Sequence, residues 1–180
     1  DQKPVQVAVF SNGDEVELIQ NGTSVGKLTS GTRLAAELPH SFLFDLTYLP
    51  GTLEAVSYKD GKEISRDTLV TTGPAKELRL IQEKKELSAN GHEVAYIRVE
   101  IVDENGIVVP DAALRLSAAV EGVGSLAAFG SSNPITDENY TSGTFTSYHG
   151  TATAIIRSGY QTGMCTLTAV SYTHLTLPTN

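Results

Sequence analysis

The sequence has few of the residues from which cross-links and metal sites are made. Its 180 residues include one cysteine, Cys165, which excludes an internal disulfide and any zinc site built on several cysteine thiolates. Four histidines are scattered along the chain, and none stands at metal-ligand spacing from another histidine, a cysteine or paired carboxylates. Tryptophan is absent, and aromatic residues make up only 7%. We therefore expect no cofactor and no metal centre.

Basic residues and long apolar runs are also scarce. The 13 Lys and Arg are outnumbered by 21 Asp and Glu, which gives a net charge of −8. Nucleic acids and anionic membranes are bound through clusters of basic residues, so we expect neither as a partner. No apolar stretch approaches the ~18 residues of a membrane-spanning helix. The chain starts at Asp1 without the apolar region of a signal peptide and becomes strand-like at once, which favours a fragment of a longer protein.

Length and motifs limit the chemistry further. With 180 residues the chain is too short for a (β/α)₈ barrel, which needs about 200 or more. It lacks the G-x-S-x-G, Walker, G-x-G-x-x-G and H-E-x-x-H motifs. An EF-hand spacing is missing as well, although Asp103, Asn105 and Asp111 could supply oxygen ligands to calcium from a loop.

Paired carboxylates, the requirement for glycosidic acid–base chemistry, occur three times. Glu15 and Glu17 share the exposed face of a strand, where carboxylates are simply solvated. The pair 103–104 lies in a turn, where Asp bonds its own backbone. The pair 137–138 lies in a long loop, a location suited to function, but nothing beside it would tune a pKa. We expect no catalytic residue in this chain.

The dominant hydrophobic period is two, which predicts half-buried strands. It is clearest over 95–101, and it recurs over 5–9, 114–120 and 165–169. The stretch 75–87 comes nearest to a helical period but fits a strand as well. Pairs such as Asn21-Gly22 and Asp60-Gly61 tolerate positive φ, and the second predicts a two-residue hairpin between 53–59 and 62–70. The spacing of turn signals predicts an all-β protein of two tandem immunoglobulin-like antiparallel β-sandwich domains.

The run Thr71–Pro74 interrupts the strands and predicts a boundary, with one domain over 1–72 and the other over 75–171. A domain of about 70 residues buries little of its surface, so we expect the first to lean on a neighbour or on upstream sequence. The tail 172–180 follows a completed strand and resembles a translated sequencing adapter. We expect it not to be native sequence and to add no core contacts.

The segment 121–150 is rich in Gly, Ser and Asn and predicts one long loop, with a helical turn near 134–140. Loops of this length are usually functional or disordered. The aromatic residues at 140, 145 and 148 could stack on a sugar ring, or they could cap the open end of the sandwich. The candidate residues for a ligand or barrel contact in this loop are Asn133, Asp137, Glu138, Tyr140, Tyr148 and His149.

Two stretches resemble the C-terminal region of bacterial glycoside hydrolase family 2, the β-galactosidase family. The first comprises Val9–Gly22 (VFSNGDEVELIQNG), Ser24–Lys27 and Tyr48–Lys62, and is similar to the small β-domain that follows the catalytic barrel. The second spans Leu78–Ala169 and is similar to the immunoglobulin-like C-terminal domain. It is marked by Leu87–Gly91, Val99–Gly106, Val109–Ala112, Val120–Gly124, Tyr148–Ala152 and Ile155–Gly159. Phe129–Pro134 (FGSSNP) departs from the family's Gly-Asn-Gly-Asp/Asn-Pro run.

The resemblance implies a division of labour. In the family the barrel supplies both catalytic glutamates, and no position here matches their motifs. It therefore implies non-catalytic accessory domains whose partners are the barrel and upstream domains of the same chain, with carbohydrate as a further possible partner. The alternatives are a carbohydrate-binding module acting on its own and an adhesion or stalk array of immunoglobulin-like repeats. The array would show near-identical repeats, and the two halves here show no clear self-similarity. A bacterial periplasmic or extracellular location is favoured over a cytoplasmic one.

Overall fold

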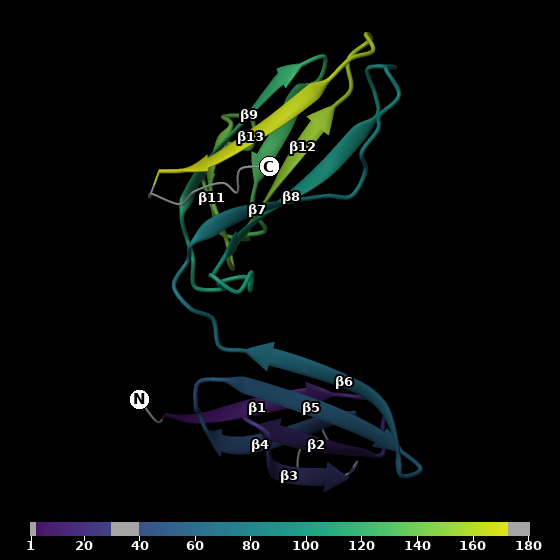
Figure 1. Ribbon diagram of the computed structural model, residues 1–180, viewed down its shortest axis with the longest axis vertical. Helices are drawn as coiled ribbons and strands as arrows, with labels where there is room; N and C mark the ends of the chain where they lie inside the picture. Colours follow the sequence, from purple (N-terminus) through teal and green to yellow (C-terminus); the bar gives the residue numbers. More distant parts are fainter. Residues whose placement is uncertain (1–2, 30–39, 173–180) are drawn as a thin grey trace. The chain divides into compact units, whose positions relative to one another are not determined.

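A computed structural model describes residues 3–29 and 40–172 of the chain. The chain divides into two compact units, Asp1–Thr71 (unit 1) and Thr72–Asn180 (unit 2). The described residues form strands, turns and loops and contain no helix, so none of them could belong to a membrane-spanning helix. All strand pairs are antiparallel (Figure 1), as the period-two pattern predicts.

Unit 1 consists of two sheets. The four-stranded sheet has the order β3-β2-β5-β6, and β1 pairs with β4 in the second sheet. The bounds are β1 (Pro4–Phe10), β2 (Glu15–Gln20), β3 (Thr23–Thr29), β4 (Ser41–Thr47), β5 (Thr52–Lys59) and β6 (Lys62–Val70). Between the sheets the core is formed by Val16 and Leu18 of β2 and by Phe42 and Phe44 of β4.

Both predicted Asx-Gly turns of unit 1 are two-residue hairpins. Asn21 and Gly22 have φ of 50° and 78°, and Asp60 and Gly61 have φ of 50° and 74°. Positive φ at both central residues matches the twist of the flanking strands, which explains the short hairpins β2–β3 and β5–β6. The hairpin predicted at Asp60-Gly61 is therefore confirmed.

Unit 2 is a sandwich of a four-stranded sheet, β10-β12-β8-β7, and a three-stranded sheet, β11-β9-β13. The bounds are β7 (Glu77–Gln82), β8 (Val94–Val102), β9 (Arg115–Gly122), β10 (Ser125–Gly130), β11 (Thr144–Thr146), β12 (Thr151–Arg157) and β13 (Cys165–Ser171). Leu116 of β9 and Phe145 of β11 face Phe129 of β10 and Ala154 of β12 in one apolar core. The all-β sandwich architecture is the predicted one.

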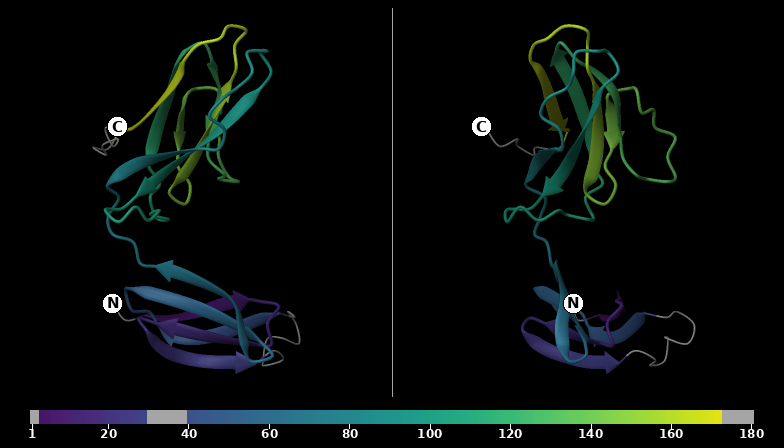
Figure 2. Two further views of the ribbon diagram at one scale, coloured as in Figure 1. Left: turned by 45° about the vertical axis from the view of Figure 1, so that its right-hand side comes forward. Right: turned by 90° about the vertical axis from the view of Figure 1, so that its right-hand side faces the viewer.

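Two local predictions for unit 2 are wrong. The segment 121–150 is not one loop, because β10 and β11 lie within it and leave a loop of residues 131–143. This loop stands out from the side of the sandwich in the right-hand view of Figure 2. The predicted helical turn near 134–140 is absent, and those residues form bends and irregular chain. The stretch 75–87 contains β7. The predicted tail lies outside the described residues except for Tyr172, which is exposed.

Candidate functional site

The loop 131–143 is the part of unit 2 where most of the candidate residues gather. It leaves the sandwich after Gly130 at the end of β10 and returns at Thr144, the first residue of β11. Backbone bonds tie its C-terminal part down: the N–H of Phe129 donates to the carbonyl of Tyr140 (2.7 Å), and that of Ala118 donates to the carbonyl of Gly143 (2.8 Å). The loop is thus a folded element fixed to β9 and β10.

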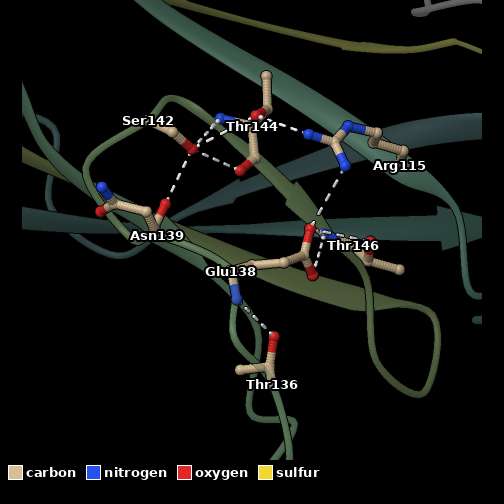
Figure 3. A network of polar contacts seen from close by, with 7 residues as sticks. All are labelled: Arg115, Thr136, Glu138, Asn139, Ser142, Thr144 and Thr146. Carbon is tan, nitrogen blue, oxygen red and sulfur yellow. Dashed lines mark hydrogen bonds and ion pairs between the residues drawn. The ribbon is translucent and has the colours of Figure 1, made fainter.

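Glu138 is the centre of a polar network that fastens the loop to the sandwich (Figure 3). Its two carboxylate oxygens accept the backbone N–H of Thr146 at 3.1 and 3.2 Å, and Oε1 also accepts the Thr146 hydroxyl at 3.1 Å. Nη1 of Arg115 lies 3.8 Å from Oε1. Arg115 also donates to the hydroxyl of Thr144 at 3.3 Å. The carboxylate therefore accepts the hydrogen bonds that Thr146 of β11 donates, and it is not directed at open solvent.

We expect Glu138→Gln to loosen this loop. The amide keeps one acceptor oxygen and turns the other into a donor, so the Thr146 N–H loses one of its two acceptors and its bond to a charged group, and we expect a loss of about 1 kcal/mol. Arg115 adds little, because it is largely exposed and distant. Limited proteolysis should cut 131–143 faster than in the original chain, with the exposed Asp137→Asn as control. Equal cleavage rates in the two variants would contradict the role assigned to Glu138.

Tyr140 packs on the sandwich with one face of its ring. It stacks on Phe145 with ring centroids 4.7 Å apart, and it lies over Gly130, where an added Cβ would come within 2.2 Å of Cδ1. Gly130 is therefore required by this close approach rather than by a turn. Tyr140 remains 45% exposed, so the outer side of its ring faces solvent.

The remaining loop candidates are less fixed. Asn133 uses its Oδ1 to accept the N–H of Ile135 at 3.0 Å, a local turn contact. Asp137 is exposed. The sequence analysis missed two features here: Ile135 is 87% exposed at the loop surface, and Oγ of Ser131 is buried with no hydrogen-bond partner among the described residues. The exposure of an apolar Ile next to Pro134 has no signal in the sequence.

Tyr148 and His149 belong to a different feature, the turn between β11 and β12. Tyr148 and Thr151 exchange backbone bonds of 2.9 and 3.1 Å, and His149 has a positive φ of 48°. Their rings meet edge to face at 4.1 Å. The neighbouring Gly150 donates to Ala112 and accepts from Ile101, which holds the turn against the loop before β9. The polar network in Figure 3 does not include this pair.

The other carboxylate candidates are engaged in structural contacts. Glu15 and Glu17 are not simply solvated as predicted: Glu15 pairs with Lys27 at 2.7 Å, and Glu17 accepts the hydroxyl of Tyr58 at 3.2 Å. A hydrogen bond from Ser24, and to a smaller extent the one from Tyr58, lowers the pKa of Glu17, while burial acts in the opposite direction. Both carboxylates of β2 are therefore bonded to a residue of a neighbouring strand, Lys27 of β3 for Glu15 and Tyr58 of β5 for Glu17.

Asp103 bonds its own backbone as predicted for a turn. Oδ1 accepts the N–H of Asn105 at 2.9 Å and of Ile107 at 3.0 Å, and Oδ2 accepts that of Gly73 at 2.8 Å. These N–H groups, Gly73 first, lower its pKa against the opposing effect of burial. The calcium proposal for this turn gains no support, because the carboxylate oxygens are already occupied. Within residues 3–29 and 40–172 no cluster of three or more His, Cys, Asp or Glu is suited to hold a metal ion.

Comparison with known proteins defines the class first. Residues 78–175 match the family described as glycoside hydrolase family 2 C-terminal domain 5, and residues 2–65 match a domain of unknown function, DUF4982. The chain belongs to glycoside hydrolase family 2 and corresponds to accessory β-sandwich domains from the C-terminal part of these enzymes. The resemblance noted in the sequence is confirmed. The two units match different families, so they are not copies of one repeat.

Particular relatives are longer enzymes. The chain is 28% identical to β-galactosidase BoGH2A of Bacteroides ovatus over 90% of this chain and 18% of that protein. It is 33% identical to a β-galactosidase of Thermoanaerobacter pseudethanolicus over 74% of this chain and 19% of that protein. The crystal structure of a family 2 member from Bacteroides cellulosilyticus matches with a TM-score of 0.90 and 31% identity, covering 99% of this chain and 24% of that one. The chain thus spans about a fifth of the length of these relatives.

Proposed function

We propose that this chain is the accessory region of a larger bacterial enzyme of the β-galactosidase type, which hydrolyses O-glycosidic bonds in a catalytic barrel outside these 180 residues. One observation carries the proposal: the likeness covers 74–99% of this chain but only 18–24% of the enzymes it resembles. The contacts support it, since Glu138, Asp103 and Glu15 all bind groups of their own unit. The work of the region is support: it packs against the barrel and upstream domains and stabilises them.

We infer further that the loop 131–143 is a contact to another domain of that enzyme. Glu138 and Tyr140 hold the loop on the sandwich, which leaves Ile135 and Asp137 to face outward. An exposed Ile on a loop that Glu138 and Tyr140 hold in place favours a protein neighbour, because apolar surface gains by burial. The free face of Tyr140 is the one feature that favours carbohydrate instead.

The purified chain is expected neither to hydrolyse nitrophenyl β-galactosides and β-glucuronides nor to bind galactosides measurably. Isothermal titration with galactose, lactose and longer galacto-oligosaccharides at millimolar concentration provides the binding measurement. Tyr160, which is 78% exposed and lies between β12 and β13, provides the control. Micromolar binding that Tyr140→Ala abolishes and Tyr160→Ala leaves unchanged would show that the chain is a carbohydrate-binding module instead. Hydrolysis by the chain itself would overturn it entirely. The coding sequence on either side of this chain tests whether it belongs to a larger enzyme, since a catalytic barrel with two catalytic glutamates is expected there.

A further inference from the structure

The two sheets of unit 1 differ in width. The four-stranded sheet β3-β2-β5-β6 is opposed by β1 and β4 alone among the described residues. β6, the strand at one edge, is exposed along all nine of its residues. Its Leu69 pairs with Leu53 of β5, and its Asp67 pairs with Ala55. Because cross-strand partners share a face, and Leu53 and Ala55 pack on the core, Leu69 and Asp67 lie on the inner face of the sheet.

A groove of about 390 Å³ follows this uncovered inner face. One wall is formed by the consecutive residues Val7–Ser11, so it is the edge of β1, rather than one of its faces, that borders the groove. The other wall is β6, with Ser65, Asp67 and Leu69, and the floor includes Leu53 and Ala55. Leu69 on this face is 65% exposed. The groove is thus apolar, elongated and parallel to a strand edge.

Among the described residues, the backbone of β1 has hydrogen-bonding groups without a partner on this side. Ser11 donates to His40, and Lys3 accepts from Tyr48, so the odd-numbered residues of this regular pair bond on the β4 side. In an antiparallel ladder the alternate residues point the other way. Ala8 and Phe10 therefore direct their N–H and C=O groups into the groove, which they also line. Such an edge is a template for a further strand.

We propose that this groove receives an extended segment from the remaining part of the family 2 enzyme, which adds to β1 as a third strand and covers the inner face of β6. The inference rests on the proposed function, and it names the surface of unit 1 through which the larger enzyme is bound. Strand addition uses main-chain bonds for affinity and alternate side chains for specificity. The apolar floor formed by Leu53 and Ala55 favours apolar side chains at alternate positions of that segment.

Charge selects the occupant. Asp67 brings a carboxylate into the groove, and within the described residues it accepts one hydrogen bond, from the neighbouring N–H of Thr68 at 2.9 Å. Arg66 pairs with Glu63 and Glu54 instead. The segment should therefore carry a Lys, Arg or amide donor opposite Asp67.

A second copy of this chain would bring together two molecules of net charge −8. The relatives, by contrast, are about four to five times as long as this chain. The rest of such an enzyme is joined covalently to this chain, so a segment of it is present at high effective concentration.

Hydrogen exchange of β1 in the isolated chain and in the full-length enzyme tests the proposal. We expect the amides of Ala8 and Phe10 to exchange at least about tenfold more slowly in the full-length enzyme. We expect Leu69→Glu to remove this protection while leaving the Tm of the isolated chain unchanged. Val70→Glu is the matched control, because Val70 pairs with Thr52 on the opposite face of the same strand, and it should leave the protection intact.

Equal, fast exchange in both proteins would overturn the groove proposal and leave the accessory role untouched. Protection in the isolated chain that grows with concentration, together with a dimer in light scattering, would overturn it in favour of a second copy. A coding sequence without a family 2 barrel would instead overturn the proposed function, which separates the two failures. Loss of protection in both the Leu69 and Val70 variants would show that β6 itself had unfolded. In that case Ala8→Pro in the full-length enzyme is the deciding variant, because it removes only the N–H at the edge of β1. If the Phe10 amide stayed protected from exchange in this variant, the proposal would be overturned.

Discussion

Replacing Phe145 by alanine is expected to lower the free energy of unfolding of unit 2 by about 3–5 kcal/mol. The ring is fully buried between the sheets, and it is also the surface on which Tyr140 stacks at 4.7 Å. Its removal opens a cavity in the core and takes away the support of the loop 131–143. Urea unfolding followed by far-ultraviolet circular dichroism gives the free energy, and hydrogen exchange assigns the change to unit 2.

Ile135→Ala is the matched control for this variant. Its side chain is 87% exposed, so the loss of its apolar atoms should change the free energy of unfolding by no more than about 0.5 kcal/mol. A Phe145→Ala variant as stable as this control would mean that neighbouring side chains move into the space left by the ring between β10 and β11. In that case Tyr140 would have moved inward, and proteolysis of the loop would be unchanged.

Asp103→Asn is expected to lower the Tm of unit 2 by several degrees at neutral pH. The carboxylate is 1% exposed and accepts three backbone N–H groups, including that of Gly73 in the segment that leads into unit 2. An amide has only one acceptor oxygen, so at least one of these buried N–H groups loses its partner. Glu104→Gln removes the same charge at the next, exposed residue and should leave Tm unchanged.

The same substitution should change how stability depends on pH. The N–H groups hold the pKa of Asp103 below its usual 3.8. A carboxyl whose folded pKa lies below the unfolded value stabilises the fold at pH values above the unfolded pKa of about 3.9. That stabilisation is lost as the pH falls through the lower, folded pKa. Tm measured from pH 5 to pH 2 should therefore fall less steeply for Asp103→Asn than for the original chain; parallel curves would contradict this role.

Strand positions and their inward faces were predictable from the hydrophobic pattern. Ala95, Ile97, Val99 and Ile101 alternate along the sequence, and all four are buried in the core of unit 2. The pattern works because a strand alternates its side chains between one buried and one exposed face. It fails at Glu100, predicted to be exposed, which is 5% exposed and is bound by Arg79 and Arg98.

The loop and the candidate site were predicted less well. A Gly-rich composition between 121 and 150 predicts one loop, but β10 runs through it. Gly130 lies in that strand because Tyr140 covers it, a contact between residues ten apart that no local signal reports. The sequence places all six candidates in one loop, yet Glu138 and Tyr140 fasten the loop 131–143 to the sandwich, while Tyr148 and His149 form a separate turn. Glu138 appeared available for a ligand only because its partner Thr146 could not be inferred from spacing.

The alternation of apolar residues, the Asx-Gly pairs and the acidic balance were enough to establish an all-β chain and to point away from nucleic acid, because each is a local or additive property. Tertiary structure alone decided which polar groups are already bonded, and which edge of β1 has no paired strand within residues 3–29 and 40–172. Those outcomes depend on residues far apart in the chain coming together, and pairing across sheets leaves no periodic trace in the sequence.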